Sequence, residues 1–163
     1  MSETAIEHKI AETLVIKRLR IATTESCTGG LLSSRLTDVS GSSSFIHLNL
    51  VTYSNEAKQK MLGVRKETLD NYGAVSEECA YEMAKGLYNL TKADVCISTT
   101  GIAGPTGGTK EKPVGLMFST IYTDKKSITF ETLLPSNTQR EKMKYLFTQS
   151  VLERLNKFLN EQN

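Results

Sequence analysis

The strongest constraint on the fold is a strand, a tight turn and a helix that follow one another near the amino terminus. Residues 20–25 form a short segment with β-branched side chains, which predicts a strand, and residues 31–36 suit a helix. The turn between them, residues 26–30, reads Ser-Cys-Thr-Gly-Gly. A second predicted strand, residues 45–53, follows a loop of glycine and serine. This order predicts a βαβ unit, whose right-handed crossover makes the two strands parallel neighbours.

Four other segments are predicted helices. They are residues 4–18, a helix starting near residue 55, a helix starting at residue 76 and a final helix after residue 136. Thr4 with Glu7, and Ser136 with Gln139, have the spacing of capping boxes at the first and last of these helices. Three more predicted strands are residues 94–99, 114–122 and 127–134. The connection between the last two is short enough for an antiparallel hairpin.

The order of elements, α-β-α-β-α-α-β-β-β-α, sets the expected architecture. It predicts a three-layer α/β/α sandwich with a mixed, mostly parallel five-stranded sheet. At 163 residues, of which 39% are hydrophobic, the chain suits one compact domain, residues 1–163, with its own core. No internal repeat or linker divides it.

Charge and composition exclude several classes of protein. Lys and Arg number 20 against 18 Asp and Glu, and this net charge of +2 is too small for the basic footprint of a nucleic-acid-binding protein. No apolar run approaches membrane-spanning length, and the amino terminus lacks the continuous hydrophobic region of a signal peptide. Three cysteines without a CxxC pair and two histidines form no metal-site pattern. We therefore expect a cytoplasmic protein that binds neither nucleic acid nor membrane and needs no metal or organic cofactor.

The turn at residues 26–30 is the first candidate for a functional site, because ligands of parallel α/β sheets collect outside the carboxyl ends of the strands. It places the Ser26 hydroxyl where unpaired N–H groups of a helix amino terminus can stabilise an oxyanion. Ser26 is therefore the first candidate nucleophile. Cys27 is the second, because a helix amino terminus also lowers the pKa of a thiol. Alternatively, Ser26 or Thr28 simply caps the following helix.

A serine nucleophile needs a base. The chain has only two histidines, His8 and His47, so few histidines could act as the base of a serine–histidine pair. Lys58 is the alternative base. Lys58 and Tyr53 lie where the second strand ends and a helix begins, so both can approach Ser26. Lys58 must be largely neutral to accept a proton, which requires burial or a neighbouring cation. The competing interpretation makes Lys58 a solvated surface lysine and Tyr53 a core residue.

A glycine-rich loop at residues 100–108 is expected at the same edge of the sheet. Its glycines leave backbone amides unobstructed, as a chain needs in order to cradle a phosphate or approach a planar ring. The lysine and hydroxyl of a P-loop are missing, so a site for a magnesium–nucleoside triphosphate is not predicted. Arg140, near the start of the last helix, either offers a bidentate guanidinium to a phosphate or is an ordinary exposed charge.

Four motifs together resemble one protein family. They are Glu-Ser-Cys-Thr-Gly-Gly at residues 25–30, Tyr-Ser-Asn-Glu-Ala-Lys at 53–58, Gly-Ala-Val-Ser at 73–76 and Thr-Gly-Ile-Ala-Gly-Pro at 100–105. With these motifs in this order, the chain resembles the CinA carboxy-terminal domain family from about Ile10 to the last helix. That family includes stand-alone deamidases of nicotinamide mononucleotide.

The resemblance implies an amidohydrolase with Ser26 as nucleophile, Lys58 as base and Tyr53 assisting. The residues that it implies around the substrate are Cys27, Thr28, Gly29, Gly30, Thr100, Gly101, Ala103, Gly104 and Arg140. The implied reaction hydrolyses nicotinamide mononucleotide to nicotinate mononucleotide and ammonia without a cofactor, and a homodimer is expected. The chain departs from many relatives near Asn49, where they have glycine, and at residues 137–139, where they have Gly-Asp before the arginine.

Two other functions stay open at this point. A chain with this fold and pocket can be a nucleotide-sensing or protein-interaction module without turnover, because a fold can persist after its catalytic activity has been lost. It can also be a hydrolase of a different amide, because neither Ser26 nor the glycine-rich loop specifies the ring that carries the amide.

Overall fold

A single five-stranded sheet forms the centre of the molecule. The computed structural model describes residues 5–161. The strands are β1 (Ile21–Glu25), β2 (Ile46–Val51), β3 (Val95–Gly101), β4 (Leu116–Tyr122) and β5 (Ser127–Leu133), in the order β2-β1-β3-β4-β5. β1 pairs in parallel with β2 and β3, whereas β3–β4 and β4–β5 are antiparallel. Four strands therefore share one direction and only β4 runs against them, which confirms the mixed, mostly parallel sheet.

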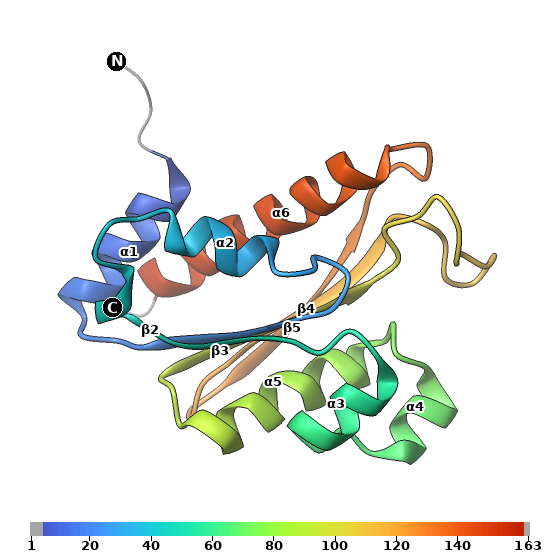
Figure 1. Ribbon diagram of the computed structural model, residues 1–163, viewed down its shortest axis with the longest axis horizontal. Coiled ribbons are helices and arrows are strands. Elements are labelled where there is room, and N and C mark those ends of the chain that lie inside the picture. The colour runs from blue at the N-terminus through green and yellow to red at the C-terminus, as the bar shows by residue number, and fades with distance from the viewer. Residues whose placement is uncertain (1–4, 162–163) are drawn as a thin grey trace.

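Helices cover both faces of this sheet (Figure 1). They are α1 (Ile6–Ile16), α2 (Leu31–Thr37), α3 (Asn55–Leu62), α4 (Lys66–Tyr72), α5 (Glu77–Thr91) and α6 (Arg140–Asn160), with a short 3₁₀ helix, η1 (Ser42–Ser44). Helices α1, α2 and α6 lie on one face, and α3, α4 and α5 on the other (Figure 1). The three-layer α/β/α sandwich is thus confirmed. No helix within residues 5–161 is both long and apolar enough to cross a membrane.

The core consists of two main apolar layers separated by the sheet. The layer under α1, α2 and α6 includes Leu14, Leu36, Ile97, Phe147 and Leu155. The layer under α3 and α5 includes Ala22, Leu62, Met83, Leu87 and Cys96. Every residue of β1 is buried, because helices cover both of its faces and strands flank both of its edges. The end of β1 is therefore a rigid base for the turn that follows.

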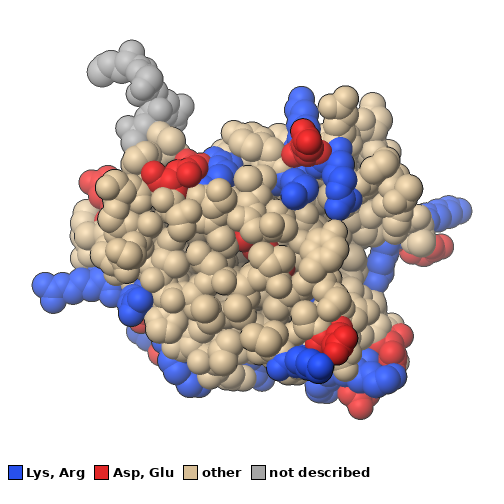
Figure 2. All heavy atoms as spheres, in the orientation of Figure 1, with Lys and Arg blue, Asp and Glu red and all other residues tan. Residues whose placement is uncertain are grey.

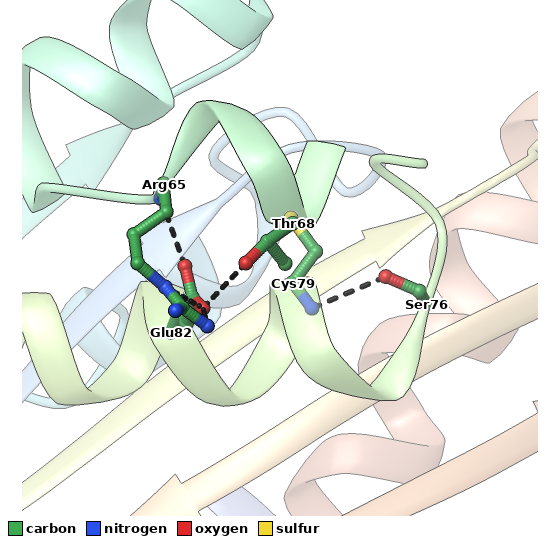
Figure 3. A network of polar contacts seen from close by, with 5 residues as sticks. All are labelled: Arg65, Thr68, Ser76, Cys79 and Glu82. Atoms are coloured by element: carbon green, nitrogen blue, oxygen red, sulfur yellow. Dashed lines mark hydrogen bonds and ion pairs between the residues drawn. The ribbon is translucent and has the colours of Figure 1, made fainter. Parts of the chain in front are cut away.

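Helix α4 is absent from the order predicted by the sequence. It has seven residues, only one of which is buried, and no side chain caps its start, so no periodic apolar pattern marks it. Contacts with α5 hold it instead (Figure 3). The Glu82 carboxylate accepts hydrogen bonds from Thr68 Oγ1 at 2.6 Å, Arg65 Nη2 at 2.9 Å and the Arg65 backbone N–H at 2.9 Å.

The helix starts agree only in part with the predicted caps. The helix predicted to start at residue 76 is α5, and Ser76 caps it, with its Oγ accepting from the Cys79 N–H at 3.1 Å (Figure 3). The capping box of Ser136 and Gln139 is wrong, because a turn at residues 135–138 delays α6 until Arg140, and no side chain caps that helix. The other predicted box includes Thr4, which lies outside the described residues.

Candidate active site

Three loops meet at the carboxyl ends of β1, β2 and β3, as the βαβ pattern predicts. Ser26 follows β1 directly, and its backbone N–H donates to the Thr99 carbonyl of β3 at 3.1 Å. On the other side, the Thr52 N–H donates to the Glu25 carbonyl at 2.9 Å and extends the pairing between β1 and β2. The Ser26 turn is thereby fixed between the ends of two neighbouring strands.

Ser26 and Lys58 contact each other at this edge. Lys58 Nζ lies 3.1 Å from Ser26 Oγ, 3.0 Å from the Thr52 carbonyl oxygen and 3.1 Å from the Tyr53 carbonyl oxygen. Lys58 is only 1% exposed and Ser26 9% exposed. Helix α3 produces this contact because Ser54 caps it, accepting from the Ala57 N–H, so Lys58 lies in the second turn facing inward. The interpretation of Lys58 as a solvated surface lysine is wrong.

The environment of Lys58 suits a proton acceptor. Burial lowers the pKa of its ammonium group, while the nearby thiols of Cys79 and Cys27 oppose that shift. A neutral amine has two hydrogens, which the Thr52 and Tyr53 carbonyls can accept. Its lone pair then remains for the third neighbour, the Ser26 hydroxyl. This is the geometry that a general base needs in order to activate a serine.

Burial of the Cys27 side chain also decides between the two candidate nucleophiles, Ser26 and Cys27. Burial raises the pKa of the Cys27 thiol to about 12, with the Glu25 carboxylate adding to the shift and a hydrogen bond to Thr99 opposing it. A thiol reacts as the thiolate, which is scarce near neutral pH at such a pKa. Cys27 is therefore not poised to attack, although its side chain lines the cavity beside Ser26.

The buried carboxylate of Glu25 organises the turn, and the sequence reasoning missed it. Its Oε1 accepts from Thr28 Oγ1 at 2.7 Å and the Leu32 N–H at 2.9 Å, and its Oε2 accepts from the Ser33 N–H at 3.0 Å. Glu25 thus satisfies the first free amides of α2 from outside the helix. The predicted cap by Ser26 or Thr28 is wrong, because the N-cap position is Gly30 and neither hydroxyl binds these amides.

The hydrogen bonds within the turn limit which of its backbone amides can donate to an oxyanion. The Gly29 N–H donates to the Ser26 carbonyl at 3.0 Å, so it is already used within the turn. Within residues 5–161, the N–H groups of Cys27, Thr28 and Gly30 have no hydrogen-bond acceptor. These three amides are the ones in the turn that remain available to a ligand.

A cavity of about 280 Å³ opens in front of Ser26 and Lys58. The predicted residues that line it are Ser26, Cys27, Tyr53, Lys58, Thr100, Gly101, Ala103, Gly104 and Arg140. Thr28, Gly29 and Gly30 do not line it. The other lining residues lie within the quoted motifs or the glycine-rich loop but were not predicted individually as site residues: Asn55, Ala74, Val75, Ile102, Thr106 and Gly107. Which residues of these segments face the cavity depends on how the loops pack together, and the motifs alone do not specify that.

The side chain of Arg140, at the start of α6, closes one side of the mouth of the cavity. Arg140 donates from Nη1 to the Gly104 carbonyl at 2.6 Å and from Nη2 to the Tyr53 hydroxyl at 3.2 Å. Tyr53 is 59% exposed, so the interpretation of Tyr53 as a core residue is wrong. Arg140 therefore joins the glycine-rich loop to the segment that follows β2.

The glycine-rich loop lies directly against β4 and the residues that precede it. A Cβ on Gly104, whose φ is +77°, would lie 2.4 Å from Val114 Cγ1, and a Cβ on Gly101 would lie 2.7 Å from the Leu116 carbonyl oxygen. Larger residues would push this backbone away from the strand. On the other side, buried Thr100 donates from Oγ1 to the Ala74 carbonyl at 2.7 Å and fixes the wall formed by residues 73–76.

A larger hollow of about 480 Å³ lies between the start of α5 and β5. Its serine, Ser76, is engaged in capping α5, and its lysine, Lys112, donates to the Tyr72 carbonyl. The smaller cavity, which holds the Ser26–Lys58 contact, is therefore the candidate active site. Within residues 5–161, no group of three or more His, Cys, Asp or Glu side chains is placed to hold a metal ion.

We predict that Glu25→Gln destabilises the protein. An amide in place of the carboxylate offers one acceptor oxygen where two now accept, so its nitrogen must face the N–H of either Leu32 or Ser33, and that N–H loses its acceptor. The free energy of unfolding in urea should fall by roughly 2–4 kcal/mol. The control is Glu12→Gln at an exposed position of α1, which should change it little. Equal stability of the two variants would contradict this role of Glu25.

Comparisons with known proteins agree with this fold. The family model of the CinA C-terminal domain matches residues 3–159. A Clostridioides difficile protein named as competence-damage inducible is 50% identical over 153 residues, which are 94% of this chain and 36% of that protein. A CinA-like protein of Chloroherpeton thalassium is 48% identical over 157 residues, which are 95% of this chain and 37% of that protein. The chain thus spans little more than a third of the length of these relatives.

Solved structures resemble the chain over nearly its full length. A competence/damage inducible protein from Agrobacterium tumefaciens superposes with a TM-score of 0.89 at 37% identity, covering 98% of this chain and 99% of that one. The competence damage-inducible protein A from Klebsiella pneumoniae superposes with a TM-score of 0.92 at 32% identity, covering 97% of each chain. From the match to the family model and from these relatives, the chain belongs to the CinA C-terminal domain family.

Proposed function

We propose that the protein is an amidohydrolase that deamidates nicotinamide mononucleotide. The observation that carries the proposal is the 3.1 Å contact between Lys58 Nζ and Ser26 Oγ, made by a lysine that is 1% exposed. Burial lowers the pKa of Lys58, so a larger fraction of this lysine is neutral than of a solvated one. A serine paired with such a lysine is a nucleophile with its own base, and a mechanism of this kind needs no metal or organic cofactor.

The first half of the proposed reaction is acyl transfer. Ser26 Oγ attacks the carboxamide carbon while Lys58 Nζ accepts the hydroxyl proton. The oxyanion that forms is held by the N–H of Cys27, the residue with a free amide in the turn that also lines the cavity. When the carbon–nitrogen bond breaks, Lys58 returns the proton to the departing nitrogen. Ammonia leaves and the acyl group remains as an ester on Ser26.

The second half is hydrolysis of that ester. Water attacks the acyl carbon, and neutral Lys58 accepts its proton. The bond to Ser26 Oγ then breaks and Lys58 gives the proton back to that oxygen. Nicotinate mononucleotide leaves, and both side chains return to their starting states.

The choice of substrate rests on the family resemblance and on the fit of the cavity. The family includes deamidases of nicotinamide mononucleotide, which has an amide on a planar ring and a phosphate at its far end. The backbone of Gly101 and Gly104 offers a surface without side chains for the ring, and the buried end of the cavity holds Ser26 and Lys58. Tyr53 and Arg140 lie at the exposed mouth, where the ribose phosphate would extend.

Replacing either member of the pair should abolish turnover. We expect Ser26→Ala and Lys58→Met each to lower the rate of ammonia release from nicotinamide mononucleotide by about a thousandfold or more, because one loses the nucleophile and the other its base. The matched control is Lys60→Met, which removes an exposed lysine from the same helix and should keep full activity. Nucleotide binding without ammonia release by the unmodified protein would instead favour a sensing module.

The pH dependence of kcat/KM should report the protonation state of Lys58. Only the neutral amine accepts the proton, so kcat/KM should rise as pH increases through the Lys58 pKa and then level off. Because burial lowers that pKa, the rise should be centred below the ordinary lysine value of about 10.4. A profile of kcat/KM measured in buffers of constant ionic strength tests this. A rise centred at or above the ordinary lysine value would contradict Lys58 as the base.

A further inference from the structure

The Cys27 amide, which holds the oxyanion in the proposed mechanism, is not oriented by a hydrogen bond of its own. Within residues 5–161 this N–H has no acceptor, which leaves it free for a ligand. Such a donor is effective only if it already points at the position of the oxyanion before the reaction. The direction of the Cys27 amide must therefore be set by its neighbours in the turn, Ser26 and Thr28.

The side chain of Thr99, near the carboxyl end of β3, contacts both of these neighbours. Its Oγ1 lies 2.8 Å from Thr28 Oγ1 and 3.4 Å from the backbone nitrogen of Ser26. The shorter bond of that nitrogen goes to the Thr99 carbonyl oxygen, at 3.1 Å. Thr99 is completely buried, with a polar side chain on the inner side of the turn. One residue of β3 thus holds the turn on either side of Cys27.

The alternation of side chains along β3 produces these contacts. Ser98 Oγ donates to the Ala80 carbonyl of α5 at 2.6 Å, on one face of the sheet. Thr100 donates on the same side, to the Ala74 carbonyl that precedes α5. Because successive side chains of a strand point to opposite faces, Thr99 points to the other face, where the turn leads into α2.

The acceptor at the end of this cluster fixes the direction of its hydrogen bonds. The Thr28 hydroxyl donates its single hydrogen to Glu25 Oε1 at 2.7 Å, and a carboxylate oxygen only accepts. In the contact between the two threonines, Thr99 is therefore the donor and Thr28 the acceptor. The Thr99 oxygen keeps its lone pairs for donors such as the Ser26 N–H. The hydroxyl of Thr99 thus suits both of its contacts with the turn.

We infer that Thr99 is a positioning residue, whose hydroxyl holds the neighbours of Cys27 so that the Cys27 amide points at the oxyanion. The inference rests on the proposed function, because it concerns the same acyl transfer at Ser26. Thr99 does not line the cavity, so it acts through the turn and does not touch the substrate.

Thr99→Val replaces this hydroxyl with a methyl group of similar size. The fold should persist, because the Ser26 N–H keeps its bond to the Thr99 carbonyl, but the turn loses the contact with Thr28. We expect kcat for ammonia release from nicotinamide mononucleotide to fall by about tenfold to a hundredfold while KM changes little. Thr99→Ser keeps the hydroxyl and should retain most of the activity.

The matched control is Thr120→Val in β4. Thr120 is also completely buried, and its hydroxyl pairs with that of Thr129 in β5 at 2.8 Å, outside the cavity. This variant should keep the kcat of the unmodified protein. Charged side chains lie mainly around the edge of the face shown in Figure 2, and neither substitution alters any of them. A difference between the two variants therefore reports the position of the lost hydroxyl.

Thr28→Val removes the other end of the same contact and gives a second measurement. If the two hydroxyls act together, kcat of the double variant should equal that of the slower single variant, whereas independent losses would multiply. The rate at which a fluorophosphonate labels Ser26 should fall in the same variants, because it depends on the same amide. The pH at the midpoint of the kcat/KM profile should not move, because Lys58 keeps its neighbours.

Several results would overturn the inference. They are an unchanged kcat in Thr99→Val, an equal loss in Thr120→Val, losses that multiply in the double variant, and loss of the fold in Thr99→Val, which would make the hydroxyl a structural requirement. Failure of the proposed function is separate. If the unmodified protein releases no ammonia but Thr99→Val alone slows the labelling of Ser26, the positioning role stands and the deamidation does not. No labelling of Ser26 in the unmodified protein would overturn both.

Discussion

The burial of one lysine amine is the constraint on which the rest of the site depends. Lys58 Nζ is enclosed by the carbonyls of Thr52 and Tyr53 and by the Ser26 hydroxyl. A charged lysine in such a place would be costly, and the environment favours its neutral form. In the proposed mechanism the neutral amine activates the Ser26 hydroxyl, so the proposed chemistry depends on the burial of Lys58.

Two of the buried ionisable groups beside Ser26, Glu25 and Lys58, lie in different surroundings. Glu25 is completely buried but receives hydrogen bonds from two backbone amides and two hydroxyls, those of Leu32, Ser33 and Thr28. Those donors satisfy both oxygens of the carboxylate. Lys58 lacks a carboxylate partner in the described part of the chain, so burial dominates. Glu25 thus fixes the position of the turn, while Lys58 is the proposed base beside it.

Much of the fold could be predicted from local pattern, because strands and long helices carry their periodicity in the sequence. All five strands were predicted to within about two residues. Helix α4 was not, since contacts with Glu82 of α5 hold it and its own apolar pattern is too short to detect. The predicted cap at Ser136 failed because a turn preceding α6 uses that segment.

The site was predictable where parallel strands bring sequence motifs to one edge. This topology is why Ser26, Lys58 and the loop after β3 lie together. The role of Glu25 was not predictable, because an acidic residue within a strand gives no sign of which amides it will meet. The engagement of Arg140 depends on how α6 packs across the sheet, and only the three-dimensional structure contains that information.

The most direct test of the Ser26–Lys58 pair is labelling with a fluorophosphonate, which reacts with activated serine hydroxyls and does not depend on the choice of substrate. The labelled residue is identified by peptide mass spectrometry in the unmodified protein, in Lys58→Met and in Lys60→Met. If the buried lysine activates the serine, Ser26 takes up the label in the unmodified protein and in Lys60→Met, and labelling is nearly lost in Lys58→Met. Equal labelling of Ser26 in all three proteins, or a label only on another residue, would contradict the account.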